Sequence, residues 1–176
     1  FNGRGTVITT MSCLLNPNRN PGLDKTALER ILCDNFSLTN VLWLQGGIVG
    51  DDTDGHVDDI VRFVDERTVV AAVETSRCAD NWKPLQDNVK ALRGMTLEDG
   101  KPVSTVEIPM PGPIVHNGIR LPASYTNFYI ANGVVIVPVF SQPNDEVALA
   151  ILQELFPDRA VHAIEASAVV WGLGAF

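Results

Sequence analysis

A weak internal repeat constrains the fold of this chain more than any other feature of its sequence. The segment Asp24–Glu29 (Asp-Lys-Thr-Ala-Leu-Glu) matches Asp145–Ala150 (Asp-Glu-Val-Ala-Leu-Ala), and the apolar run that begins at Val41 matches the run that begins at Val161. Both matches are about 120 residues apart, and a third helical pattern, Trp82–Leu92, falls midway between them. The sequence therefore predicts a recurring unit of roughly 60 residues, and a period of this size dictates the architecture.

Each unit is expected to have the order strand, strand, helix, strand. β-Branched and apolar runs bounded by turn residues predict the strands, and apolar faces preceded by capping residues predict the helices. The expected strands are 6–10, 41–44, 58–64, 68–73, 103–108, 127–131, 134–140 and 161–164; the expected helices start after Asp24, near Trp82 and at Asp145; the expected loops include 14–22 and 109–122. A single unit cannot bury its sheet face, so several units must pack around a common axis. The loops that leave the last strand of each unit, 46–55, 109–122 and 166–176, should then lie in the same part of the molecule.

The segment Gly47–Asp59 concentrates the chemistry of the chain, with five carboxylates and one imidazole within nine residues. If the following strand begins near His56, successive side chains alternate between faces, and His56 and Asp58 point the same way, roughly 7 Å apart. A group that transfers protons and a carboxylate would then face one space. Three of the other four carboxylates are interpreted as solvated or loop-capping: Asp51, Asp52 and Asp59.

A calcium loop is the alternative interpretation of this acidic segment. The EF-hand register fails, because Gly50 stands where the first ligand is needed and Val61 stands where the last glutamate is needed. We therefore expect no metal site here.

Composition restricts the function further. The net charge of −8 argues against nucleic-acid and anionic-membrane partners and favours a cationic ligand. No apolar run reaches the roughly 18 residues of a membrane span. The three cysteines lack paired spacing, which fits a reducing compartment, and two of them are interpreted as small core residues: Cys13 and Cys33.

Four segments together resemble the family of agmatine deiminases and the related bacterial peptidylarginine deiminases. They are Trp43-Leu with Gly50-Asp-Asp-Thr-Asp-Gly-His-Val-Asp-Asp59, Leu15-Asn-Pro-Asn-Arg-Asn-Pro21, Leu121-Pro-Ala-Ser-Tyr-Thr-Asn-Phe-Tyr129 and Val135-Ile-Val-Pro-Val-Phe140. The resemblance covers nearly the whole chain. It implies the α/β pentein fold, a propeller of five ββαβ units, of which this chain would hold about three: roughly 1–58, 59–126 and 127–176.

The resemblance also implies a chemistry, the hydrolysis of a guanidine group without a cofactor. A cysteine thiolate with a lowered pKa attacks the guanidinium carbon, and a histidine protonates the leaving ammonia and then activates water. Carboxylates hold the planar cation. By resemblance His56 is the catalytic histidine, Asp58 is a catalytic and substrate-binding carboxylate, and Asp54 helps to bind the distal amine of agmatine.

The expected reaction converts agmatine and water to N-carbamoylputrescine and ammonia in the cytoplasm. Two alternatives stay open: a peptidylarginine deiminase with the same chemistry, and a non-catalytic module that binds guanidines or polyamines. The small-molecule guanidino substrate and the remainder of a parent chain are the expected partners, with neither nucleic acid nor membrane among them, and a homo-oligomer is left open.

The sequence departs from the family pattern at the nucleophile. The family cysteine follows a glycine-rich run that ends in His-Cys, whereas here the run Gly172–Phe176 ends the chain two residues before that position. A family glutamate and aspartate precede the segment that begins at Phe1. We therefore expect a C-terminal half of a deiminase that is inactive alone, since none of its cysteines matches the nucleophile.

Other polar and aromatic residues carry weaker expectations. Candidates for lining the mouth of the pocket are Asn18, Arg19, Arg120, Tyr125 and Asn127. His116 and His162 are interpreted as structural, in a loop without a partner and in a strand respectively. The three tryptophans, Trp43, Trp82 and Trp171, are expected in the core or at an interface.

Overall fold

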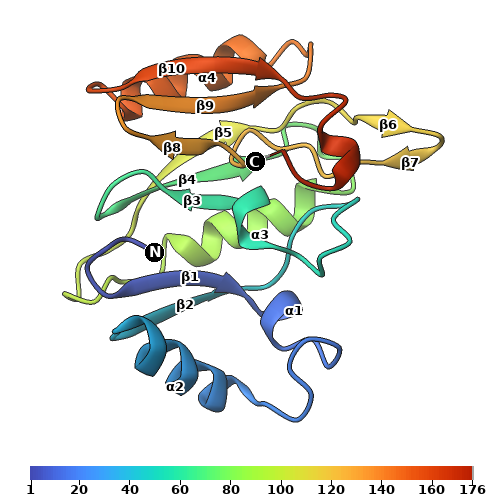
Figure 1. Ribbon diagram of the computed structural model, residues 1–176. Helices are drawn as coiled ribbons and strands as arrows, with labels where there is room; N and C mark the ends of the chain where they lie inside the picture. Colours follow the sequence, from blue (N-terminus) through green and yellow to red (C-terminus); the bar gives the residue numbers. More distant parts are fainter. Residues whose placement is uncertain (176) are drawn as a thin grey trace.

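The computed structural model describes residues 1–175 and shows a mixed α/β chain built on three sheets of two or three strands, with a small hairpin at one side (Figure 1). In Figure 1 the three sheets lie one above another in sequence order, with the first at the bottom and the third at the top. The mixed α/β class expected from the sequence is confirmed.

The first sheet is a parallel pair, β1 (Thr6–Thr10) and β2 (Asn40–Leu44). Parallel neighbours need a long crossover, and the connection contains α1 (Met11–Leu14) and α2 (Lys25–Phe36). As predicted, Asp24 caps α2: its Oδ1 accepts a 2.8 Å hydrogen bond from the backbone N–H of Ala27.

The second sheet contains β3 (Val61–Phe63), β4 (Thr68–Val73) and β5 (Ser104–Pro109). β3 and β4 pair antiparallel through a tight connection, and β5 pairs parallel to β4 after the crossover through α3 (Trp82–Leu92).

The third sheet has the same arrangement. β8 (Tyr129–Ala131) and β9 (Val134–Val139) form an antiparallel hairpin, and β10 (Ala160–Glu165) returns parallel to β9 after α4 (Asp145–Leu155). The predicted turn at Asn132-Gly133 is confirmed, with Gly133 in the left-handed region at φ 75° that this turn requires.

Four short elements were not predicted. They are α1, the hairpin of β6 (Val115–His116) and β7 (Ile119–Arg120), and two 3₁₀ turns, η1 (Val57–Asp59) and η2 (Val170–Gly172). The turn η1 also makes one prediction wrong. The strand expected from residue 58 begins only at Val61, because a turn and not a strand carries Asp58 and Asp59.

Two apolar clusters hold the layers together. One lies among the first sheet, the second sheet and α3, and includes Leu44, Val69 and Leu85; the other lies among the second sheet, the third sheet and α4, and includes Ile108, Val135 and Leu152. All six of these side chains are fully buried. Because β4 contributes to both clusters, with Val69 in one and Val70 in the other, the second sheet is the central layer.

Two buried asparagines of the α3 region hold the start of the acidic loop. Oδ1 of Asn88 accepts from the backbone N–H of Gln45 and its Nδ2 donates to the carbonyl oxygen of Gly46, while Oδ1 of Asn81 accepts from the backbone N–H of Val49. These three bonds replace the backbone pairing that a loop lacks. They fix the loop to a helix that is itself packed in the core.

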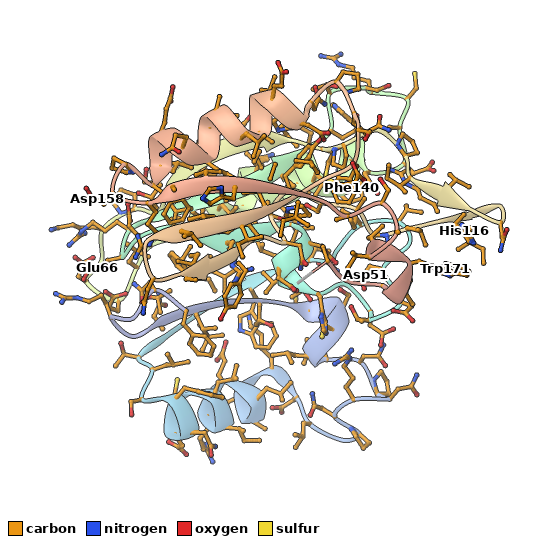
Figure 2. All side chains as sticks on the ribbon, turned by 45° about the horizontal axis from the view of Figure 1, so that its top comes forward. Asp51, Glu66, His116, Phe140, Asp158 and Trp171 are labelled. Carbon is orange, nitrogen blue, oxygen red and sulfur yellow. The ribbon has the colours of Figure 1, made fainter. Side chains whose placement is uncertain are left out.

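The loops that leave the three sheets meet at one end of the molecule, as the repeat predicted. A Cβ added at Gly50 would lie 2.5 Å from the carbonyl oxygen of Arg120, so the acidic loop packs directly on the base of the β6–β7 hairpin. Figure 2 shows His116 of that hairpin beside Trp171 of η2, and their ring centroids are 3.8 Å apart. Among residues 1–175 no helix is long and apolar enough to cross a membrane.

Candidate active site

His56 and Asp58 lie together, as the sequence predicted, although the geometry differs from the prediction. Their side chains project from η1 and the residue before it, and His56 Nδ1 is 3.7 Å from Asp58 Oδ1. The expected separation of roughly 7 Å along a strand was wrong because the 3₁₀ turn shortens the rise per residue to about 2 Å. Both side chains are about two-fifths exposed, so a ligand can reach them.

A buried segment holds Asp58 from the opposite side. Residues 121–128 are buried throughout, and the Nδ2 of Asn127 donates a 2.8 Å hydrogen bond to Asp58 Oδ2. The Oγ1 of Thr126 donates a 2.9 Å bond to the backbone carbonyl oxygen of Asp58. The carboxylate is therefore fixed at its backbone and at one oxygen, while Oδ1 faces His56.

Asn127 also connects Asp58 to the end of the described chain. Its Oδ1 accepts a 3.1 Å hydrogen bond from the backbone N–H of Ala175. Its Nδ2 and Oδ1 thus join the turn η1 to the segment that follows η2. Asn127 was predicted only as a residue of the pocket mouth, and its buried position makes it instead a support for Asp58.

The acidic loop is ordered by one of its own carboxylates. Asp51 accepts from the backbone N–H of Thr53 at 2.8 Å through Oδ1 and from the backbone N–H of His56 at 2.7 Å through Oδ2. The loop-capping role expected of Asp51 is confirmed. Asp52 is exposed, as expected of a solvated residue.

The loop also depends on a close approach at Gly55. Gly55 has φ 93°, and a Cβ there would lie 2.3 Å from Ser12 Oγ, so only glycine fits at this position. Its carbonyl oxygen accepts a hydrogen bond from the buried Oγ1 of Thr10, at the end of β1. His56 therefore follows a residue, Gly55, that is fixed by its close approach to Ser12 and by the hydrogen bond from Thr10.

Asp54 already has a cationic partner. Its Oδ2 lies 3.7 Å from Nε of Arg19, and the Nη2 of Arg19 donates a 2.9 Å hydrogen bond to the carbonyl oxygen of Thr53. Both side chains of the pair are about two-fifths exposed. An ion pair in water at this exposure is worth about 0–1 kcal/mol, so a cationic ligand can compete for Asp54.

A small cavity of about 190 Å³ opens beside Asp58. Its wall is mainly apolar and includes Val57, Val61 and Phe63, with the half-buried Arg62 as its second charged residue. Arg62 lies over the ring of Phe128 at 5.0 Å, and burial lowers the pKa of its guanidinium while Asp58 opposes that change. A larger hollow of about 630 Å³ lies elsewhere, between Arg4 and Phe36, and contains none of the site residues. The cavity beside Asp58 does not include His56, and a separate cavity of about 300 Å³ includes Asp54.

Asp59 was predicted to be solvated or loop-capping, and this prediction is wrong. Its side chain points into the protein and the residue is 5% exposed. Burial, followed by the negative charges of Asp58 and Asp51, raises the pKa of Asp59 to about 8. No pattern in the acidic segment distinguishes this carboxylate from its neighbours.

Cys13 is not suited to act as a nucleophile at this site. Cys13 is buried near it, and burial raises the pKa of its thiol, with Asp51, Asp54 and Asp58 adding to that effect and Arg19 opposing it. A thiol with a raised pKa is a poor nucleophile. Cys33 is only half-buried, which departs from its core assignment, and Cys78 is exposed.

The remaining candidates divide between core and surface. Tyr125 is fully buried, and its hydroxyl donates a 2.6 Å bond to Asp145 Oδ1, so it is not at a pocket mouth. Trp43 is buried as predicted, whereas Trp171 is 58% exposed. His116 has a partner in Trp171, contrary to prediction. The other positions are an exposed Asn18, a half-buried Arg120, a half-buried Trp82 and an exposed His162 in β10.

No group of three or more potential metal ligands occurs among residues 1–175. The arrangement instead offers one imidazole, one oriented carboxylate and a small, mainly apolar cavity. Such a site can bind a planar cation at Asp58 and transfer protons at His56.

Comparison with known proteins finds relatives named agmatine deiminase. The agmatine deiminase of Pseudomonas fluorescens is 34% identical over 98% of this chain and 52% of its own length. The solved agmatine deiminase of Enterococcus faecalis is 34% identical and superposes with a TM-score of 0.95 over 100% of this chain and 53% of that one. A C. jejuni agmatine deiminase with substrate bound is 32% identical, with a TM-score of 0.93 over 100% of this chain and 51% of its own.

This chain thus spans about half the length of the relatives that it matches. The model of one family, described as Porphyromonas-type peptidyl-arginine deiminase, matches residues 1–176. The protein therefore belongs to the Porphyromonas-type peptidyl-arginine deiminase family.

Proposed function

We propose that this chain is part of a hydrolase that removes ammonia from a guanidine group, with agmatine as the substrate and N-carbamoylputrescine as the ureido product. The observation that carries the proposal is the pairing of His56 with an oriented Asp58, whose Oδ1 lies 3.7 Å from the imidazole Nδ1. The relatives named agmatine deiminase, which match almost the whole chain, support the choice of agmatine.

Asp58 binds the guanidinium in this proposal. A guanidinium presents N–H groups in a planar fork that matches carboxylate oxygens. Asn127 holds one oxygen of Asp58 and Thr126 holds its backbone, so the carboxylate does not have to be ordered when the substrate arrives. This pre-organisation lowers the entropic cost of binding.

His56 transfers the protons. A cysteine thiolate attacks the guanidinium carbon, and His56 gives a proton to the nitrogen as the C–N bond breaks and ammonia leaves. His56 then takes a proton from water, which attacks the same carbon; the C–S bond breaks, the ureido product leaves and the thiolate is restored. By resemblance the cysteine belongs two residues beyond Phe176, in the remainder of a parent chain.

Asp54 binds the distal ammonium of agmatine, and its ion pair with Arg19 weakens when it does so. In the same proposal the parent chain completes a five-unit propeller, of which units at roughly 1–58, 59–126 and 127–176 belong to this sequence. A cytoplasmic location and a homo-oligomeric parent are parts of the proposal as well.

A peptidylarginine deiminase is the second candidate, and the description of the matching family favours it. The two share the chemistry at His56 and Asp58 and differ in what lies beyond the guanidine. Agmatine carries a second cation, whereas a peptide carries a neutral backbone.

The test measures ammonia and ureido product from agmatine and from an arginine-containing peptide, using a parent protein of the relatives' length. Agmatine turnover that disappears in His56→Asn supports the proposal, and turnover of the peptide alone favours the second candidate. Binding of guanidines without turnover by a parent with an intact His-Cys pair would favour a binding module and overturn the hydrolase. The 176-residue protein is the matched control, and it should release no ammonia because none of its cysteines matches the position of the family nucleophile.

A further inference from the structure

Asp59 is a buried carboxyl group that the proposed chemistry does not use. It lies on η1 next to Asp58, and its Oδ1 is sealed from solvent and has no hydrogen-bond partner among residues 1–175. Buried polar atoms are nearly always paired, because an unpaired one destabilises the folded state. An unpaired buried oxygen beside a catalytic carboxylate calls for a specific explanation.

The surroundings of Asp59 disfavour a negative charge. The two charged groups that act on it are Asp58 of the same turn and Asp51 of the acidic loop, and both are negative. The packed strand β1 (Thr-Val-Ile-Thr-Thr) has no charged residue, and the cation of β3, Arg62, acts on Asp58 and not on Asp59. The charged groups that act on the carboxyl are therefore both repulsive toward its ionised form.

A buried carboxylate without a cation or hydrogen-bond donors strongly destabilises the folded state, and such a group keeps its proton instead. Burial and the neighbouring charges act in this same direction, and they raise the pKa of Asp59 to about 8. In neutral solution the turn then carries one negative charge, on Asp58. In alkaline solution it would carry two adjacent charges, and the one on Asp59 would be largely buried.

We propose that Asp59 is a pH-sensitive switch of the site: it keeps its proton in neutral solution, and loss of the proton in alkaline solution loosens η1 and weakens the Asp58–Asn127 hydrogen bond. In this step the O–H bond of Asp59 breaks, its electron pair stays on the carboxylate, and the proton passes to a base in the solvent. The new charge gains hydration only if the turn opens.

Opening of the turn would weaken a small set of hydrogen bonds. Within it the backbone N–H of Ile60 donates to the carbonyl oxygen of Val57 at 3.0 Å, and at its end the backbone N–H of Ala72 donates to the carbonyl oxygen of Ile60 at 2.8 Å. Outside it Thr126 and Asn127 hold Asp58. Asn127 is thus both a support of the site and a reporter for it. This inference concerns the charge of the turn and does not depend on which guanidine compound is the substrate.

Nuclear magnetic resonance on the 176-residue protein tests the switch. The side-chain ¹³Cγ resonance of Asp59 should titrate near pH 8, and the Nδ2 proton resonances of Asn127 should change with the same midpoint. In Asp59→Asn, which keeps the shape of the side chain and cannot ionise, the change at Asn127 should disappear.

Two further variants make the test independent of the folding of Asp59→Asn. Asp58→Asn removes the adjacent charge and should lower the midpoint of Asp59, whereas Asp52→Asn, on an exposed residue of the acidic loop, should leave it unchanged. Titration of Asp59 near pH 4 in the wild-type protein would overturn the proposal. So would an alkaline change at Asn127 that persists in Asp59→Asn.

Discussion

The side-chain amide of Asn127 donates a 2.8 Å hydrogen bond to Oδ2 of Asp58, across 69 positions of sequence. The same side chain accepts a bond from the backbone N–H of Ala175. One buried residue thus ties the acidic turn to the last described segment of the chain. The free energy of this tie, and its effect on Asp58, can be measured.

Asn127→Ala should destabilise the protein by about 1–3 kcal/mol, because it removes both bonds and leaves buried polar groups without partners. Urea denaturation of the 176-residue protein measures the loss. Asn18→Ala is the matched control: Asn18 is exposed, and its change should stay within about 0.5 kcal/mol. Equal stability of the two variants would show that the hydrogen bonds of Asn127 make no net contribution to the free energy of unfolding.

His56→Ala and Asp58→Ala should impair an active parent enzyme in different ways. His56 acts on the leaving ammonia and the incoming water, so its loss should lower kcat by about 10²–10⁴-fold. Asp58 contacts the cation throughout, and losing a charge-assisted bond of about 1.5–3 kcal/mol should raise KM as well as lower kcat. Asp58→Asn keeps the shape without the charge and separates positioning from charge pairing.

Steady-state kinetics with agmatine make this comparison, and Asp59→Ala tests which carboxylate faces the substrate. If Asp59→Ala abolished activity while Asp58→Ala left kcat and KM intact, the roles of the two carboxylates would be reversed.

Asp54→Asn should raise the KM for agmatine by several-fold and leave that for methylguanidine, which has no distal ammonium, unchanged. The reason is the loss of an exposed charge contact worth about 0–1 kcal/mol. Arg19→Ala should not raise the KM for agmatine, because it frees Asp54 from its ion pair at 3.7 Å. An equal effect of Asp54→Asn on both compounds would show that Asp54 acts on the loop and not on the ammonium.

Tyr125→Phe should cost about 1–2 kcal/mol of stability. It removes the 2.6 Å bond from the phenol to Asp145; burial, followed by this bond, raises the pKa of Tyr125. Tyr129→Phe is the matched control, since Tyr129 is 53% exposed. Thermal or urea unfolding of both variants distinguishes a real hydroxyl contribution from a general effect of the substitution.

Asp59→Asn should stabilise the protein in a pH-dependent way. Because the folded state raises the pKa of Asp59 from 3.8 to about 8, it binds more protons than the unfolded state between these values, and stability falls as pH rises through that window. Asparagine cannot ionise, so Asp59→Asn removes this loss of stability with rising pH. At about 1.4 kcal/mol per pH unit, the gain should be near zero at pH 4 and as much as about 4 kcal/mol at pH 7.

Urea unfolding of the wild-type protein and the variant at pH 4, 7 and 9 measures this gain. It should level off above pH 8. A constant difference between the two proteins at all three values would mean that Asp59 does not titrate with folding.

Much of the fold followed from local sequence. β-Branched runs such as Thr6–Thr10 form strands wherever a partner is available, and the Asp24 side chain caps α2 by a bond that spans three residues. The convergence of the loops followed from the repeat, since similar units stacked side by side bring their equivalent connections to one end. These features depend on short-range chemistry and on periodicity.

The turn η1 shows where this reasoning failed. The apolar residues after Asp58 suggested a strand, but the pairing with β4 begins only at Val61. Alternation alone cannot locate the first residue of a strand, because the partner strand decides where the ladder begins. His56 and Asp58 were paired correctly, and their separation was wrong for this reason.

The sequence by itself determined the three long helices and most of the strands, the position of the acidic loop and the pairing of His56 with Asp58, because these depend on neighbouring residues. Tertiary structure alone decided that Asn127 supports Asp58, that Asp59 is sealed and that Tyr125 belongs to the core. Each of these depends on contacts between segments distant in sequence. Asp58 and Asp59 are adjacent in the chain, but the packing of β1 and β3 against η1 buries Asp59 and leaves Asp58 partly exposed.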